Sequence, residues 1–200
     1  MNDIRDWTGN KTAVSSTLGA SNLSDKVRAE RDYYATPSRA LDAVIPYLDK
    51  NYPIWEPACG EGHLSKTLKD KGFTVKESDV IVRSYPCEQI DFLQMGRHEW
   101  NGDILTNPPF ISAKEFAEKA IDTLVEGKKL FLFLRVQFLE SQKRRYLFEN
   151  SPPKFILVYS KRNPQCARNG DFSKPTGNAS MYCWFIWEKG IKTEPIIKWI

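Results

Sequence analysis

The chain of 200 residues is 41% hydrophobic and 27% charged, which suffices for one globular domain with a buried core and is short for two. No apolar run approaches the roughly 18 residues of a membrane-spanning helix, and residues 1–20 contain no apolar signal-peptide core. Four cysteines without a CxxC pair argue against a disulfide framework and a clustered zinc site. The composition therefore predicts a soluble, cytoplasmic protein without a metal.

The net charge of +4 is unevenly distributed along the chain. Residues 1–127 carry 15 Lys and Arg against 20 Asp and Glu, whereas residues 128–174 carry 11 against 3. A segment with a net charge of +8 can attract a polyanion such as a nucleic acid. A solvated lysine-rich surface produces the same pattern, so charge alone leaves both interpretations open.

The predicted elements alternate between helices and strands, which favours an α/β fold. Residues 1–31 are polar and aperiodic and are expected to form an arm ahead of a single domain at 32–200. A helix is expected to start at Pro37, and Pro46 should kink or end it early. Apolar periodicity and turn residues then predict a strand at 53–55, a helix at 63–70, a strand at 73–76 closing on Asp79, a strand ending near 90–91, a strand at 103–106, a helix at 113–126, a central strand at 130–134, a helix at 141–149 and strands at 155–159 and 181–187.

The first strand, helix and strand carry the pattern of a nucleotide-type binding half. Gly60 and Gly62 form the turn before the helix, and Asp79 closes the following strand. Glycines let the backbone approach a ligand, and an acid at that strand end can bind ribose hydroxyls. Each feature has an ordinary alternative, since Asp79 can be a turn residue and Asp91 a helix cap.

The tetrapeptide Asn107-Pro108-Pro109-Phe110 directly follows the strand at 103–106. The two prolines fix the backbone and lack N–H donors, so carbonyls and the Asn107 amide oxygen are available as acceptors. Two acceptors, the Asn107 oxygen and the Pro108 carbonyl, suit an exocyclic amine and would make its conjugated nitrogen more nucleophilic. Phe110 could stack on the base, a contact worth roughly 1–3 kcal/mol. The alternative is an ordinary strand-ending loop with a buried phenylalanine.

In this order, the motifs resemble those of the class I S-adenosylmethionine-dependent methyltransferases, specifically the adenine-N6 DNA methyltransferases with small phage-like members. The resemblance covers most of 33–200 and implies a Rossmann-like fold with a mostly parallel sheet, an antiparallel C-terminal strand and helices on both faces. It implies catalytic roles for Asn107, Pro108, Pro109 and Phe110. The S-adenosylmethionine site it implies consists of Thr36, Pro37, Glu56, Pro57, Ala58, Gly60, Gly62, Asp79, Asp91, Phe92 and Asn107.

In the chemistry that the resemblance implies, the amine of a flipped-out adenine attacks the sulfonium methyl directly, without a covalent enzyme intermediate. Flipping costs a few kcal/mol, which phosphate contacts must offset. DNA is therefore the expected partner, and no separate sequence-reading domain is expected in this chain. The candidate phosphate ligands, each of which can also be a solubilising surface residue, are Lys143, Arg144, Arg145, Lys161, Arg162, Arg168 and Lys174.

Other substrates remain open at this stage. Tetrapeptides of the form Asn-Pro-Pro-aromatic also serve enzymes that methylate a protein glutamine amide or a ribosomal RNA guanine. Cytosine N4 is a further competitor, although its enzymes usually open the tetrapeptide with serine. An inactive methyltransferase fold retained for binding would be expected to have lost the asparagine, the glycine turn or the acids, and all of these are present.

Overall fold

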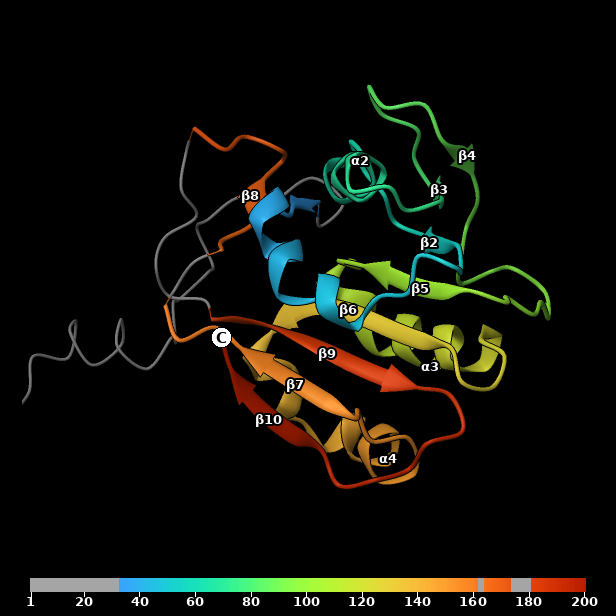
Figure 1. Cartoon of the computed structure of the whole chain (residues 1–200), viewed down its shortest axis with the longest axis vertical. Coiled ribbons are helices and arrows are strands. Elements are labelled where there is room, and N and C mark those ends of the chain that lie inside the picture. Colours follow the sequence, from blue (N-terminus) through green and yellow to red (C-terminus); the bar gives the residue numbers. More distant parts are fainter. Residues whose placement is uncertain (1–32, 162–163, 174–180) are drawn as a thin grey trace, which may run out of the picture.

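The computed structural model describes residues 33–161, 164–173 and 181–200; the predicted arm at 1–31, Arg162 and Lys174 lie outside the described residues. The described chain forms an eight-stranded sheet with the order β10-β7-β9-β6-β5-β2-β3-β4 (Figure 1). Among the paired strands of this sheet, β9 alone runs antiparallel to its neighbours. The predicted α/β fold with a mostly parallel sheet is therefore confirmed.

The boundaries of most elements agree with those expected from periodicity. The strands of the large sheet are β2 (Ile54–Glu56), β3 (Val75–Asp79), β4 (Glu88–Gln89), β5 (Asp103–Thr106), β6 (Lys129–Arg135), β7 (Phe155–Val158), β9 (Tyr182–Glu188) and β10 (Ile196–Trp199). The helices are α2 (His63–Asp70), α3 (Ala113–Thr123) and α4 (Gln142–Asn150), with short 3₁₀ helices at Ser38–Ala43, Ile45–Tyr47, Phe110–Ser112 and Val136–Leu139. A separate antiparallel pair joins β1 (Tyr34–Ala35) to β8 (Ala167–Arg168).

The helix expected after Pro37 is replaced by two short 3₁₀ helices, and this part of the prediction is wrong. Pro46 is the reason, because it has no N–H to donate and disfavours the α conformation of the residue before it. The chain instead closes tighter turns, in which the N–H of Val44 donates to the carbonyl of Leu41 at 2.9 Å. The apolar face is as predicted, since Ala40, Leu41 and Val44 are buried.

The core lies on both faces of the sheet, and strand β6 shows why. Leu130, Leu132 and Leu134 pack into the cluster beneath α3 and α4, whereas Phe131 and Phe133 pack into the cluster beneath α2 and the first 3₁₀ helix. Successive side chains of a strand point to opposite faces, so an uninterrupted apolar run needs a cover on each side. The predicted central strand with helices on both faces is thus confirmed. No helix of the described residues has the length and apolar character to span a membrane.

Chain topology places a binding edge between β2 and β5. From β2 the chain proceeds outward to β3 and β4 and then returns to β5 on the opposite side of β2. In open α/β sheets, ligands bind outside the carboxyl ends of the strands at such a reversal of strand order. Glu56 ends β2, Asp79 ends β3 and Asn107 follows β5, so three predicted site residues meet at this edge.

Candidate functional site

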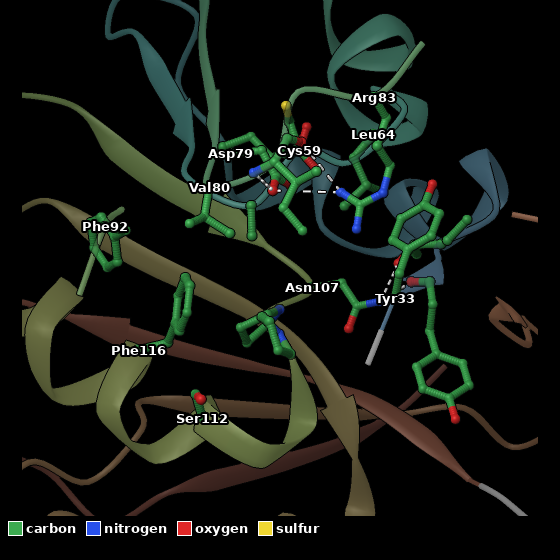
Figure 2. A pocket seen from close by; sticks show the side chains of 18 of the residues that line it. Tyr33, Cys59, Leu64, Asp79, Val80, Arg83, Phe92, Asn107, Ser112 and Phe116 are labelled. Atoms are coloured by element: carbon green, nitrogen blue, oxygen red, sulfur yellow. Dashed lines mark hydrogen bonds and ion pairs between the residues drawn. The ribbon is translucent and has the colours of Figure 1, made fainter. Parts of the chain in front are cut away.

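A cavity of about 270 Å³ opens at the carboxyl edge of β2, β3 and β5 (Figure 2). Most of the sequence-predicted residues line it, namely Thr36, Glu56, Ala58, Asp79, Asp91, Phe92, Asn107, Pro108 and Pro109. Lining residues that the sequence analysis did not assign include Tyr34, Arg83 and Phe116. The residues that were predicted for the site but are absent from its lining are Pro37, Pro57, Gly60, Gly62 and Phe110.

The glycine turn shapes the cavity from behind. Gly60 and Gly62 have φ values of +56° and +71°, in the left-handed region that favours glycine. The N–H of Gly60 donates to Oδ2 of Asp79 at 2.8 Å, which ties the turn to the end of β3. A Cβ atom at Gly60 would lie 2.5 Å from the ring of Tyr33. The two glycines therefore allow close packing, and Gly60 fixes Asp79; neither glycine lines the cavity itself.

Asp79 is buried and held in a defined orientation at the edge of the cavity. Its Oδ1 accepts the N–H of Ile81 at 2.9 Å and pairs with the guanidinium of Arg83 at 3.5 Å. Arg83 in turn lies over the ring of Tyr33, 4.2 Å from its centroid, as the labelled side chains in Figure 2 show. The hydroxyl of Tyr33 donates to Glu61 at 3.1 Å, and burial beside this carboxylate raises the pKa of Tyr33.

Glu56 is the most deeply buried acid of the cavity. Its carboxyl accepts a hydrogen bond from the hydroxyl of Ser65 on α2. The pKa of Glu56 is raised to about 8, mainly by burial; hydrogen bonding with Ser65 opposes the shift, and the charges of Glu77 and Asp79 add to it. Glu56 is therefore largely protonated at neutral pH, and a cation in the cavity would favour its ionised form.

Replacing Glu56 by glutamine should stabilise the protein in a pH-dependent way. The pKa of this carboxyl is about 8 when folded and near 4.5 when unfolded, so the wild type loses stability as the pH rises through that interval. Glutamine keeps an acceptor for Ser65 and does not ionise. We expect the free energy of unfolding of Glu56→Gln to exceed that of the wild type by ~1–3 kcal/mol at pH 8 and to approach it at pH 4.

Urea denaturation at pH 4, 6 and 8 measures this difference. Glu88→Gln is the matched control, because Glu88 is an exposed carboxylate on β4 that pairs with Lys76 at the surface. The control should show no such trend. A stability gain of Glu56→Gln that is independent of pH would contradict the buried, protonated state of Glu56.

Asn107 has a fixed side-chain orientation. Its Nδ2 donates to the carbonyl of Tyr34 and to Oγ1 of Thr36, both at 2.8 Å, and lies 3.5 Å from Sγ of Cys166. Its Oδ1 is buried and has no hydrogen-bond partner among the described residues. A buried acceptor without a partner costs about 1–3 kcal/mol. The side chain of Asn107 is therefore arranged to accept a hydrogen bond from a ligand that enters the cavity.

The two-stranded sheet explains how this orientation arises. Antiparallel pairing of Tyr34 with Arg168, and of Ala35 with Ala167, brings the segment before the first 3₁₀ helix against the loop that precedes β9. Cys166 is thereby buried beside Thr36. No periodic signal in the sequence indicates these contacts, which is why Tyr34 and Cys166 were not predicted for the site.

Phe110 belongs to an aromatic cluster beside the cavity. Its ring centroid lies 5.3 Å from that of Tyr34 and 6.1 Å from that of Tyr182. The guanidinium of Arg135 lies 4.8 Å from the Phe110 ring. Of these two neighbouring rings, Tyr34 lines the cavity and Phe110 does not.

The predicted phosphate ligands have different environments. The guanidinium of Arg144 donates to the carbonyls of Phe138 at 2.7 Å and Gln137 at 3.1 Å, which completes the 3₁₀ helix before α4. Arg145 pairs with Glu149 at 2.6 Å on the exposed face of α4. Lys143 and Lys161 are exposed, and Arg168 is half-buried on β8. In the described residues, no group of three or more His, Cys, Asp or Glu side chains is placed to hold a metal ion.

Comparison with solved structures agrees with this architecture. A candidate class I S-adenosylmethionine-dependent methyltransferase from Listeria monocytogenes matches with a TM-score of 0.58 and 14% identity, over 94% of this chain and 71% of its own. A candidate RNA methyltransferase from Pyrococcus horikoshii matches with a TM-score of 0.53 and 13% identity, over 91% of this chain and 99% of its own. The type IIG restriction endonuclease BpuSI matches with a TM-score of 0.56 and 14% identity, over 90% of this chain and 28% of its own. The sequence itself matches no family model and no curated protein.

The protein therefore has the Rossmann-like fold of the class I methyltransferases. At these identities the similarity establishes the fold, and the chemistry of the site has to be argued from the residues of this chain.

Proposed function

We propose that this protein is an S-adenosylmethionine-dependent methyltransferase that methylates the exocyclic N6 amine of a flipped-out adenine in DNA. The observation that carries the proposal is the orientation of Asn107. Its Nδ2 is engaged by protein acceptors, whereas its buried Oδ1 has no partner among the described residues. Such an acceptor requires an N–H or O–H donor, and an exocyclic amine supplies one.

The residues of the cavity fit the cofactor. The carboxyl groups of Glu56, Asp79 and Asp91 line the cavity, and the positive charge of S-adenosylmethionine would favour the ionised form of Glu56. We assign Asp79 to the ribose hydroxyls and Asp91 to the adenine. Phe92 and Phe116 stack with a centroid distance of 5.2 Å and form an apolar wall for that adenine. When bound, the cofactor supplies an electrophilic methyl group on a positively charged sulfur.

Asn107 would act on the substrate amine. A hydrogen bond from the amine to Oδ1 favours the pyramidal, nucleophilic form of the nitrogen and stabilises the positive charge that develops on it. The reaction needs no covalent nucleophile. Burial raises the pKa of Cys59 and also that of Cys166, to about 12, so both thiols stay protonated. The proton released by the amine can leave to water.

One observation favours a nucleic acid as the substrate, and a second favours DNA. The segment 128–174 carries the excess of positive charge that phosphate binding needs. BpuSI, one of the structures similar to this chain, is a restriction endonuclease. An asparagine at the first position of the tetrapeptide favours adenine over cytosine. We therefore place adenine in DNA ahead of RNA and protein amides.

The product tests this proposal directly. Incubation of the protein with DNA and isotopically labelled cofactor should place the label in N6-methyladenine, measured by mass spectrometry of the digested nucleosides. RNA and a cell protein extract are incubated in parallel. Label found only in N4-methylcytosine, only in RNA or only in protein would show that the substrate is wrong while leaving the fold unaffected.

A further inference from the structure

Arg135 lies beside the proposed acceptor site but has no role in the function derived so far. It ends β6, the strand that pairs in parallel with β5 and aligns Thr106 with Leu132. The residue after Thr106 is Asn107, so Arg135 and Asn107 leave neighbouring strands at the same edge. Arg135 donates to the hydroxyl of Tyr182, which contacts Cys166, and Cys166 contacts Asn107. Side-chain contacts thus connect the guanidinium to the catalytic amide.

The charge of Arg135 is not neutralised within the described residues. No carboxylate there forms an ion pair with it, in contrast to Arg83 and Arg145. Its Nε is buried without a hydrogen-bond partner in the same part of the chain. A partly buried cation without a counter-charge is costly, and an anionic ligand would remove that cost.

Aromatic packing holds the guanidinium in place. It lies 4.8 Å from the ring of Phe110 and 5.9 Å from the ring of Tyr34. A guanidinium held against aromatic rings keeps its planar fork of N–H donors, which matches two oxygens of a phosphate. Tyr182 is the hydrogen-bond partner in this cluster, and the guanidinium has five N–H donors.

We propose that Arg135 binds a phosphodiester group that flanks the methylated nucleotide. The inference rests on the proposed action on DNA and adds a residue that distinguishes nucleic acid from a protein amide, since a glutamine side chain brings no anion. Arg135 could instead contact the edge of the base, but then the guanidinium would have to lie in the plane of a base that stacks on the same aromatic rings. A contact with the neighbouring phosphate has no such requirement.

The test removes each partner of the proposed contact in turn. In an oligonucleotide whose methylated adenine has been mapped, the flanking phosphates are replaced by uncharged methylphosphonates. We expect kcat/KM of the wild type to fall about ten- to a hundredfold with this substrate. Arg135→Gln should lose a similar factor on natural DNA, mainly through KM, and should lose almost nothing further on the methylphosphonate substrate.

Arg135→Lys keeps the charge without the fork and should recover part of the loss. Arg97→Gln is the control, because Arg97 is an exposed arginine on the segment between β4 and β5, and its loss should be small and should not depend on the methylphosphonates. If the losses of kcat/KM caused by Arg135→Gln and by the methylphosphonates multiply, the two do not act through one contact. That result would overturn the inference about Arg135 and leave the proposed function standing. So would a changed base preference with an unchanged methylphosphonate effect. A wild type that methylates no DNA would overturn the proposed function itself.

Discussion

Replacing Asn107 by alanine should lower the rate of methyl transfer about 10²- to 10³-fold while the affinity for S-adenosylmethionine stays within a few fold of the wild type. The side chain contributes a single acceptor, Oδ1, and that buried atom has no hydrogen-bond partner among the described residues. Asn107→Asp should fail as well, because a carboxylate cannot donate to the carbonyl of Tyr34 or to Thr36. Single-turnover rates and calorimetric titration of the cofactor separate the two effects.

Asn101→Ala is the matched control for this substitution. Asn101 is exposed in the turn that leads into β5, so its removal should leave the rate of transfer unchanged. A rate of methyl transfer for Asn107→Ala within tenfold of the wild-type rate would contradict the hydrogen bond proposed between the substrate amine and Oδ1. A parallel loss of cofactor affinity would instead assign Asn107 to the cofactor side of the cavity.

Asp79→Asn should weaken S-adenosylmethionine binding about ten- to a hundredfold, because hydrogen bonds from ribose hydroxyls to a charged carboxylate are stronger than those to a neutral amide. Asparagine keeps one oxygen that can accept the N–H of Gly60 or of Ile81, so the glycine turn is disturbed less than by alanine. Arg83→Gln is the companion variant, since it removes the ion pair and leaves the carboxylate in place.

Isothermal titration with circular dichroism as a check of folding decides the role of Asp79. A folded Asp79→Asn variant that binds the cofactor as tightly as the wild type would remove the ribose assignment. Equal losses in Asp79→Asn and Arg83→Gln would show that the ion pair, and not the ribose contact, supports binding.

The sequence could predict the elements that depend on local patterns. Helix α2 and strand β5 have the expected boundaries because amphipathic period and an apolar run define them within a few residues. Strand β10 was not predicted: its residues are exposed, so no alternation of buried and exposed positions marks it. Strands β1 and β8 are two residues long and exist through their pairing with each other. Pairing between segments that are distant in the chain produces no periodic pattern of apolar residues in the sequence.

The same distinction applies to the site. Asp79 and Asn107 were predicted because Asp79 ends a strand and Asn107 follows one in a recognisable order, and parallel strands bring their carboxyl ends together. The orientation of the amide was not predictable, since it depends on Tyr34, Thr36 and Cys166, which are distant in sequence. The raised pKa of Glu56 likewise depends on burial beneath α2 and on neighbouring strands.

The hydrogen bonds on Nδ2 of Asn107 bridge sequence separations of 73, 71 and 59 residues. Contacts of that separation close long loops of the chain, and the entropic cost of closing them has to be offset by the rest of the fold. A folding chain that already contains β2, α2, β3 and β5 would hold most of the proposed catalytic and cofactor residues and still have an amide free to rotate. Methyl transfer would therefore depend on the formation of these long-range contacts, and partly folded chains that lack them would not methylate their substrate.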